Sequence, residues 1–474
     1  MAEATQTKTT IAIDPVTRIE GHLKAEVVVE NGKVVDAKLT GGMYRGFESI
    51  LRGRHPRDAA QIVQRICGVC PTAHATAASI ALEKASGTAV PSNGRATRNL
   101  ILGANYLQSH ILHFYHLAGQ DFIQGPDTAP FMPRYAKPDL RLPPAINAVG
   151  VDQYVEALEV RAVCHEMVAL FGGRMPHVHG ILAGGAAEIP TKEKLVEYAA
   201  RFKKVRKFVE EKYLPVVYLV GSQYKDLGAF GQGYRNALCV GVFPLDDEGK
   251  EFVFKAGAYQ DGKDMPFDVK RVTEDVKFSW FADSTSGKPF TKGENVLEVD
   301  KKGAYSFVKA PLYNGKPMEV GPLARMWVNN KPISSIGQKL FKEYFGLDVK
   351  NFRLAFSLLG RHVARAEESY LMLDVVERFL KEVRPDEETF SMPVMKDSEG
   401  FGFTEAPRGS LMHFTKVRNG KIDNYQIVSA TLWNCAPRND TGMRGALEEA
   451  LIGVPVPDIE NPVNIARLIR AFDP

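Results

Sequence analysis

The chain has 474 residues, of which 45% are hydrophobic and 24% are charged, and its formal net charge is only +4. This length allows two or three domains or one large, elaborated core, and the composition is ordinary for a globular enzyme. The small net charge gives no support for nucleic-acid binding. No apolar run approaches the roughly 18 residues that are needed to cross a bilayer, so we expect no direct membrane span.

The N-terminal region is predicted to contain a β hairpin. Leu23–Glu30 and Lys33–Leu39 flank Asn31-Gly32, a dipeptide typical of two-residue hairpin turns. The preceding Asp14–His22 mixes charged and apolar residues, which is consistent with either a surface turn or a polar site. Glu48 follows a glycine-rich stretch and is either solvated or a ligand of a cation.

The segment Arg65–His74 contains the densest cluster of candidate metal ligands. It places Cys67 and Cys70 on a glycine-containing turn, and His74 follows four residues later. A helix over residues 56–66 is predicted to end at this turn and the next to begin at Pro71, so the sulfur atoms should converge between two helices. Thiolates held in this way bind soft metals. By itself the pair is also consistent with half of a structural zinc site, a redox pair or two inert cysteines.

Long helices are predicted next. Residues 95–124 form one of roughly 45 Å at 1.5 Å per residue, and residues 152–170 and 191–212 form two more, the last ending before Pro215. The proline-rich residues 126–148 are predicted to be a loop.

Three histidines lie on the first long helix. His110, His113 and His116 spread over about 120° of its surface instead of forming one line. We therefore interpret them as core histidines bonded to neighbouring groups.

The second half of the chain alternates in character. Residues 225–320 contain short β-like runs, such as Glu251–Lys255 and Tyr305–Val308. A strong helix is predicted for Arg361–Val383, and Asn419-Gly420 closes a second hairpin.

These elements predict a mainly α fold of the α+β class, with a long-helix bundle as the core and small β elements at the N-terminus and in the middle. Cys164, Cys239 and Cys435 are not in iron–sulfur spacing, so electrons would have to leave through another polypeptide. We expect one large domain over residues 1–474, with an N-terminal β hairpin region at 11–45, a helical core at 46–224, a β-containing excursion at 225–320, and a further helical core with a hairpin and a last helix at 321–474.

The cysteine turn, together with Arg18–His22, resembles the large subunit of nickel–iron hydrogenases. The similarity runs along nearly the whole chain. Its other motifs are Arg45–Glu48, His113–Leu117, Pro176-His177, Tyr305–Lys309, Gly321–Arg325, Ala406–Gly409 and Arg467–Pro474.

The resemblance implies a nickel held by four thiolates, two of which bridge to an iron that also carries CO and cyanide. It makes Cys67 a terminal nickel ligand and Cys70 a bridging ligand. Soft thiolates keep nickel accessible to redox change. His74 is expected to donate a hydrogen bond to the sulfur of Cys70 and so to tune the metal.

The resemblance also implies residues that surround the metals. Arg408 corresponds to an arginine over the open metal position, where its permanent charge polarises hydrogen. Pro407 is expected to line the pocket of the diatomic ligands, Thr431 to hydrogen-bond a cyanide, and Asp473 to lie in the surrounding polar shell. Glu20 matches the glutamate that receives the proton of heterolytic cleavage.

A second ion and a gas path follow from the same resemblance. Glu48 and the backbone carbonyl of Ile427 match two ligands of a buried Mg²⁺ or other divalent ion, with Lys309 nearby. Val69 and Leu117 match positions that narrow the gas channel, although each is equally well explained as an apolar core residue.

Two departures from the family pattern concern the metal site. Ser109 stands where many members have an aspartate that pairs with the arginine. The family continues after the equivalent of Pro474 with Cys-x-x-Cys-x-x-His, which supplies the other two thiolates. In the nickel–iron–selenium branch the first of these is selenocysteine, encoded by UGA. We expect that the sequence was cut at this codon; the alternative is an inactive, truncated apo subunit.

We therefore predict the catalytic large subunit of a hydrogenase that oxidises hydrogen or reduces protons. It should need maturation proteins and pair with an iron–sulfur small subunit. Because the N-terminus lacks a secretion signal, the partner should carry the export signal to the periplasm, with the cytoplasm as the alternative. The rivals are a metal-free relative, such as a respiratory complex I subunit, and a structural zinc protein. Cys67, Cys70 and Arg408 argue against the metal-free relative.

Overall fold

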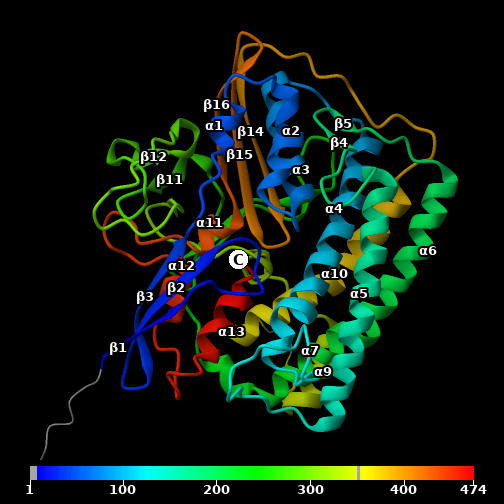
Figure 1. Cartoon of the computed structure of the whole chain (residues 1–474). Coiled ribbons are helices and arrows are strands. Elements are labelled where there is room, and N and C mark those ends of the chain that lie inside the picture. Colours follow the sequence, from blue (N-terminus) through cyan, green and yellow to red (C-terminus); the bar gives the residue numbers. More distant parts are fainter. Residues whose placement is uncertain (1–7, 350–352) are drawn as a thin grey trace, which may run out of the picture.

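The computed structural model describes residues 8–349 and 353–474. Helices account for 43% of the chain and strands for 19%, and the strands form several small sheets instead of one large one. The predicted mixture of helices with small β elements is confirmed (Figure 1). Residues 1–7 and 350–352 lie outside the described part of the predicted domain.

Both predicted hairpins are confirmed. At the N-terminus, β1 (Thr9–Ile13), β2 (Leu23–Glu30) and β3 (Lys33–Gly41) form an antiparallel sheet in which Asn31 has a φ of 52°. Near the C-terminus, β14 (Ser398–Ala406), β15 (Gly409–Arg418) and β16 (Lys421–Val428) form another antiparallel sheet. In both turns an Asn-Gly pair supplies the left-handed backbone that a tight hairpin requires.

Helix α3 (Pro71–Ser86) lies on the C-terminal sheet, as Figure 1 shows. It begins at Pro71 and ends at Gly87, which has a φ of 73°, as predicted. Small residues allow a close approach: a Cβ atom on Gly402 would lie 2.0 Å from the carbonyl oxygen of Ala77. This close packing holds α3, which follows the cysteine turn directly, against β14 and β15.

The segment before the cysteine turn differs from prediction. Helix α1 (Phe47–Leu51) precedes it. In place of one helix over residues 56–66, the structure has the 3₁₀ turn η1 (Pro56–Asp58), the short α-helix α2 (Ala59–Ile62) and the 3₁₀ turn η2 (Val63–Ile66). Gln64 donates a hydrogen bond to the carbonyl of Val178, 2.9 Å away, so tertiary contacts determine the local winding here.

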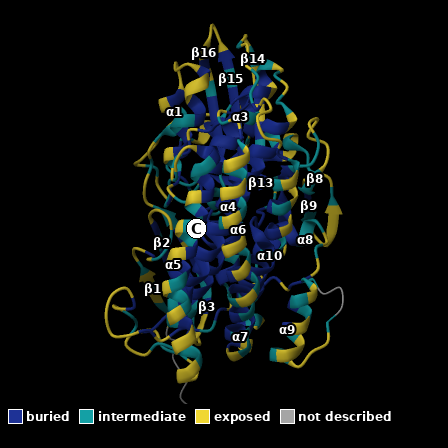
Figure 2. Ribbon diagram, turned by 90° about the vertical axis from the view of Figure 1, so that its right-hand side faces the viewer, coloured by how far each residue is buried: buried dark blue, intermediate teal, exposed yellow. Residues whose placement is uncertain are grey.

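Long helices form the other half of the molecule. Helix α4 (Ser92–Leu112) packs against α5 (Pro144–Gly172) and α10 (Leu358–Glu382), and α5 packs against α6 (Lys192–Phe208). In Figure 2, α6 shows a mainly exposed outer side, whereas α4 and α10 are largely buried.

Two helix boundaries were predicted wrongly. Helix α5 begins at Pro144, inside the predicted loop 126–148, because proline is well suited to the first turn of a helix. The third helix does not stop before Pro215. A π-helical turn over Val209–Tyr213 leads into α7 (Leu214–Gln223), where the proline occupies the first turn and needs no N–H partner.

The three histidines of α4 and its π-helical extension are buried and bonded, as predicted. Nε2 of His110 lies 2.8 Å from Glu368, Nε2 of His113 lies 2.6 Å from the carbonyl of Arg470, and Nε2 of His116 lies 3.2 Å from that of Tyr154. They connect α4 to α10, to the C-terminal helix and to α5.

The middle of the chain is rich in short strands, as expected, but Tyr305–Val308 is not a strand. Only Ser306 forms a bridge there, with Ser279, because the segment crosses to the N-terminal sheet and Phe307 donates to the carbonyl of Gly41. The remaining elements are β4 (Ile181–Leu182), β5 (Gly185–Ala186), β6 (Ala237–Cys239), β7 (Val242–Pro244), β8 (Phe252–Phe254), β9 (Gly257–Gln260), β10 (Lys263–Met265), β11 (Val272–Asp275), β12 (Lys288–Pro289), β13 (Ala310–Tyr313), α8 (Pro322–Val328), α9 (Ser335–Phe345), α11 (Ala430–Asn434), α12 (Ala446–Leu451) and α13 (Val463–Phe472).

A fully buried charge cluster joins α8, α10 and β14. The guanidinium of Arg325 donates two hydrogen bonds of 2.6 Å to Glu368 and one of 2.9 Å to Glu405. It also donates to the carbonyls of Ala406 and Pro407, at 3.0 and 2.7 Å. One arginine therefore fixes both the ion cluster and the backbone that immediately precedes Arg408.

Replacing Arg325 with Met should destabilise the protein strongly. The substitution leaves two buried carboxylates without their cation, which costs about 3–5 kcal/mol in comparable cases. The free energy of unfolding in denaturant measures the loss. As a control, Arg201→Met removes a half-exposed ion-pair partner of Glu166 and should cost less than about 1 kcal/mol. Equal effects of the two substitutions would contradict the role assigned to the cluster.

Candidate metal centre

One cavity collects most of the predicted metal-site residues. It has a volume of about 480 Å³, and its walls include Cys67, Cys70, Glu20, Arg408 and Pro474. These side chains come from the loop between β1 and β2, the joint before α3, the turn between β14 and β15, and the segment after α13. The fold therefore brings together chain segments that are hundreds of residues apart in sequence.

Cys67 and Cys70 face each other across the turn. Their Cα atoms are 5.5 Å apart and their sulfur atoms are in contact. The backbone N–H of Cys70 points at the sulfur of Cys67, 3.0 Å away. Both residues are 7% exposed, so the pair is shielded by the protein while it borders the cavity.

Side chains from other elements hold the backbone of this turn. Arg45 donates hydrogen bonds to the carbonyls of Arg65 and Ile66, at 2.8 and 2.6 Å. A carboxylate oxygen of Glu20 accepts one from the N–H of Gly68, at 3.0 Å. The positions of the two sulfur atoms are thus fixed from outside the turn.

Gln108 makes a further contact that the sequence did not reveal. Its amide group is fully buried on α4 and donates to the carbonyl of Val69, 3.0 Å away. Its own oxygen faces Nε of Arg161 and Nε2 of His165, each at 3.3 Å. The sequence shows Gln108 only as one polar residue of a predicted helix, and the structure shows that it is buried.

Arg408 lies over the cysteine pair and is itself held by Asp473. Its Nε donates to a carboxylate oxygen of Asp473 at 2.8 Å, and one terminal nitrogen lies 3.8 Å from the sulfur of Cys67. The other carboxylate oxygen is 3.8 Å from Nε of Arg365, a neighbour that the sequence reading missed. Burial acts to raise the pKa of Asp473, but Arg408, His113 and Arg365 outweigh it and hold that pKa well below its usual value.

His74 borders the cavity but contacts a different partner from the one predicted. Its Nδ1 lies 3.2 Å from Nε2 of His413, whose Nδ1 lies 2.8 Å from the hydroxyl of Tyr425. Among the described residues no hydrogen bond joins it to Cys70. Burial, together with the charge of Arg45, lowers the pKa of His74 to about 3, so the imidazole is neutral.

A smaller cavity of about 170 Å³ contains the predicted site of the divalent ion. Glu48, Ile427, Lys309, Glu274 and Asn295 line it. Burial raises the pKa of Glu48, and the amide oxygen of Asn295 has no hydrogen-bond partner within the described chain. A carboxylate and an unpaired amide oxygen suit a hard cation.

The remaining predicted site residues do not all lie in the same cavity. Thr431 borders the larger cavity, as does Cys435, whose thiol pKa burial raises to about 12. Pro407 contributes its carbonyl to Arg325. Val69 and Leu117 border neither of the two cavities, so their assignment to a gas channel stays a prediction.

The position that differs from the family pattern is also buried. Ser109 is fully enclosed, and its hydroxyl has no hydrogen-bond partner within residues 8–349 and 353–474. Among the described residues, the carboxylate that pairs with Arg408 is that of Asp473.

The sequence profile of the nickel-dependent hydrogenases matches residues 45–127 and 122–474. This chain belongs to that family. It is 59% identical to the periplasmic [NiFeSe] hydrogenase large subunit of Desulfomicrobium baculatum, with 98% of this chain and 94% of the relative covered. It is 32% identical to the hydrogenase-2 large chain of Escherichia coli K12, with 98% and 95% covered.

Solved structures of [NiFeSe] hydrogenases are closely similar to this chain. The Ni-Fe-Se hydrogenase of Desulfovibrio vulgaris Hildenborough in its reduced state superimposes with a TM-score of 0.98 at 68% identity, covering 99% of this chain and 98% of the other. The reduced, active enzyme of Desulfomicrobium baculatum gives 0.97 at 59% identity, with 98% and 99% covered. Within the described residues, no helix is both long and apolar enough to cross a membrane.

For a nickel-dependent hydrogenase, the donor atoms present fit part of the metal centre. Two soft sulfur donors border a cavity with room for a group of several atoms, and a cation covers it. No three Cys, His, Asp or Glu side chains of the described residues converge on one point. The other donors of a complete metal centre would therefore be atoms other than these two sulfur atoms.

Removing the charge of Asp473 should change the acid stability of the protein. Because its folded pKa is lowered, the carboxylate contributes stability that is complete above the unfolded pKa of about 4 and is lost as the pH falls below it. Asp473→Asn should therefore be less stable at neutral pH and lose less stability on acidification, as followed by thermal melts. Asp264→Asn, on an exposed strand, is the control. Identical acid profiles for Asp473→Asn and the parent would contradict the assignment.

Removing the amide of Gln108 should loosen the cysteine turn. Gln108→Leu deprives the Val69 carbonyl of its donor and should cost about 1–3 kcal/mol. Amide hydrogen exchange at residues 68–70 should accelerate. Gln108→Glu keeps an oxygen that accepts from Arg161 but removes the N–H that donates to Val69. Its free energy of unfolding should therefore be closer to that of the parent than that of Gln108→Leu is, whereas amide exchange at the turn should remain accelerated. Unchanged exchange at this turn in Gln108→Leu would refute the contact.

Proposed function

We propose that this chain is the catalytic large subunit of a [NiFeSe] hydrogenase. It oxidises H₂ to protons and electrons, reversibly, and the electrons pass to a small subunit. The observation that carries the proposal is the pair of buried sulfur atoms under Arg408, in a chain that matches [NiFeSe] enzymes over 98% or more of its length. The proposal gives each residue of the cavity a definite task.

Cys67 and Cys70 would hold the nickel–iron centre, the first as a terminal and the second as a bridging ligand. When bound, this centre supplies the open coordination position at which H₂ is polarised and its electrons are accepted. Soft thiolates suit it, and the firmly held turn keeps the sulfur atoms in place. These two cysteines would supply two of the four thiolates of the centre, and Pro474 forms part of the wall of the same cavity.

Arg408 provides a fixed positive charge over the sulfur of Cys67. Its ion pair with Asp473 orients the guanidinium, which needs no proton exchange to act. A preorganised charge in a buried site stabilises developing negative charge more strongly than a mobile one. Thr431, which lies in the cavity wall, would hydrogen-bond a cyanide ligand of the iron, and Pro407, which precedes Arg408, would line the pocket of the diatomic ligands.

Glu20 receives the proton that leaves a cysteine sulfur. Its carboxylate borders the cavity and already accepts a hydrogen bond from Gly68, which fixes it beside the turn. A carboxylate within reach of a thiol is a suitable general base. His74, held neutral by burial, lies in the same cavity wall as Cys70 and would tune its sulfur through the nitrogen that does not face His413.

Glu48 and the carbonyl of Ile427 bind Mg²⁺ or another divalent ion, with Lys309 beside them. The buried carboxylate and the unpaired oxygen of Asn295 support this assignment. Val69 and Leu117 narrow the gas path.

The subunit works with an iron–sulfur small subunit and is assembled by maturation proteins. It acts in the periplasm, exported with the small subunit, since the Desulfomicrobium relative is periplasmic. The long helices act as one bundle that supports the cavity. The division of the chain into an N-terminal hairpin region, two helical parts and a β-containing excursion stays part of this proposal.

The test is hydrogen-dependent dye reduction by the heterodimer from its native host. The parent enzyme should be active, and Arg408→Lys should lose roughly 100-fold or more, because a preorganised charge is replaced by a shorter and more flexible one. Arg418→Lys, at the exposed end of β15, should keep full activity. A parent enzyme that does not turn over hydrogen, or an Arg408→Lys variant with full activity, would overturn the proposal.

A further inference from the structure

Three buried polar side chains form a chain of hydrogen bonds that ends at the cavity of Cys67 and Cys70. Nδ1 of His74, on α3, lies 3.2 Å from Nε2 of His413, on β15. Nδ1 of His413 lies 2.8 Å from the hydroxyl of Tyr425, on β16. His413 and Tyr425 are fully enclosed, and His74 borders the cavity. The chain of hydrogen bonds therefore connects the core of the C-terminal sheet with the cavity wall.

The end of this chain at the cavity is the Nε2 atom of His74. Because Nδ1 faces His413, Nε2 is the ring nitrogen that remains for the cavity. It makes no hydrogen bond within the described residues, and it is not fully enclosed. Whether it offers a proton or a lone pair to the cavity depends on the tautomer of His74.

Both imidazoles are neutral, and the phenol carries its proton. Burial, together with the charge of Arg45, lowers the pKa of His74 to about 3. Burial also holds the pKa of His413 well below its usual value. The pKa of Tyr425 is raised by burial and by the charge of Glu48. Each imidazole therefore has one N–H and one bare nitrogen, and the phenol has one O–H.

Only two arrangements of these protons satisfy both contacts. In the first, the hydroxyl of Tyr425 donates to Nδ1 of His413, whose Nε2–H donates to Nδ1 of His74. His74 then carries its own proton on Nε2. In the second, every donor and acceptor is exchanged, and His74 presents a bare nitrogen to the cavity.

The hydroxyl of Tyr425 favours the first arrangement. In the second, its oxygen accepts a hydrogen bond from His413, so its O–H needs a different acceptor. Within residues 8–349 and 353–474 the hydroxyl has no hydrogen-bond partner other than His413, and the carboxylate of Glu48 is not bonded to it. A buried O–H without an acceptor is costly. The first arrangement gives this O–H an acceptor and directs the last N–H toward the cavity.

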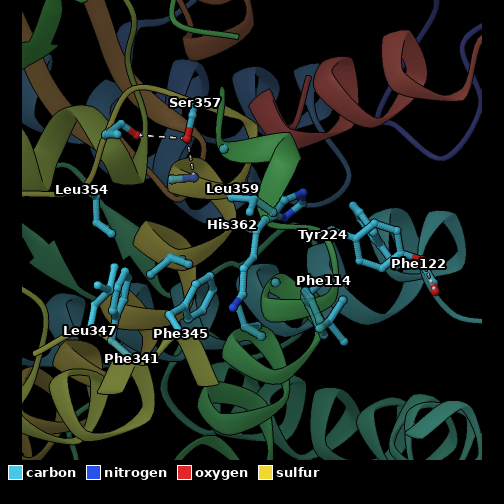
Figure 3. Close-up of a pocket in the computed structure, with 18 residues that line it drawn as sticks. Phe114, Phe122, Tyr224, Phe341, Phe345, Leu347, Leu354, Ser357, Leu359 and His362 are labelled. Carbon is cyan, nitrogen blue, oxygen red and sulfur yellow. Dashed lines mark hydrogen bonds between the residues drawn. The ribbon is translucent and has the colours of Figure 1, made fainter. Parts of the chain in front are cut away.

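A buried histidine on α10 lacks such a chain of hydrogen bonds. His362 borders a separate cavity of about 330 Å³ beside α7, α9 and α10, which shares no lining residue with that of Cys67 and Cys70 (Figure 3). Neither ring nitrogen of His362 has a hydrogen-bond partner among the described residues. No contact therefore selects the tautomer of His362, whereas His413 and Tyr425 select that of His74.

We propose that Tyr425 and His413 are positioning residues that fix the proton of His74 on Nε2, so that a neutral N–H donor faces the cavity. The acceptor of this N–H, a cysteine sulfur of the metal centre, rests on the function proposed above; the position of the proton does not. A hydrogen bond to a sulfur ligand withdraws electron density from the sulfur and from the metals it holds. A fixed donor of this kind tunes the centre without exchanging its own proton.

Neutron diffraction of the deuterated heterodimer from its native host reads the proton positions directly. Deuterium should be bound to Nε2 of His74, to Nε2 of His413 and to the hydroxyl oxygen of Tyr425, and both Nδ1 atoms should be bare. Deuterium on either Nδ1 atom would overturn the inference. The measurement does not depend on hydrogen turnover, so an inactive enzyme with this proton pattern would refute only the proposed function.

Substitutions at His413 test the effect on the metal centre. His413→Leu removes the donor to His74. The carbonyl and cyanide infrared bands of the iron should then move to lower wavenumber, because less electron density is withdrawn from the cysteine sulfur. His413→Gln keeps an N–H for His74 and an oxygen for Tyr425, so its bands should stay at the parent positions.

The control is Phe414→Leu, at the next residue of β15. Phe414 is buried, but its side chain lies on the other face of the sheet, so its removal should leave the infrared bands unchanged. Parent band positions in His413→Leu, or the same shift in His413→Gln and Phe414→Leu, would overturn the role of His413. If His413→Leu does not assemble, the proton positions in the parent enzyme still decide the inference.

Discussion

The position of the sulfur atoms of Cys67 and Cys70 depends on hydrogen bonds that reach the cysteine turn from outside. A turn of this length cannot satisfy its own backbone groups, so other elements do so. Arg45 holds the carbonyls that precede Cys67, Glu20 holds the N–H of Gly68, and Gln108 holds the carbonyl of Val69. Three side chains from separate parts of the fold thereby fix one loop.

The opposite wall of the cavity is fixed by buried charge. Arg325 holds the carbonyl of Pro407, and Asp473 orients the guanidinium of Arg408. Both contacts are almost fully enclosed, where electrostatic interactions are stronger than in water and a missing partner is costly. Helix α4 supplies Gln108, which bonds to the cysteine turn on one wall. Helix α10 supplies Glu368, which holds Arg325 and thereby the backbone of the other wall. The helical half therefore helps to position both walls of the cavity.

Local signals in the sequence predicted the local structure well. Asn31-Gly32 and Asn419-Gly420 closed the two hairpins, and Pro71 and Gly87 bounded α3, because these residues restrict the backbone directly. The helix continuing through Pro215 was missed because a π-helical turn before it accommodates the ring, which only the tertiary packing determines.

The site was predictable only in part. Cys67, Cys70, Arg408 and Glu20 were found through motifs, and the structure brings all four to one cavity. Partners such as Gln108 remained hidden, because their role depends on which helix lies behind the turn and not on any nearby residue. The same limit explains His74, whose contact with His413 joins positions 339 residues apart.

The most direct test of the central claim is nickel K-edge X-ray absorption of the complete heterodimer from its native host. The account predicts nickel bound by sulfur and selenium, with an iron neighbour, and the loss of this signal in Cys70→Ser, while Cys164→Ser, a buried cysteine outside the cavity, retains it. A parent protein without nickel, or an unchanged nickel environment in Cys70→Ser, would contradict it.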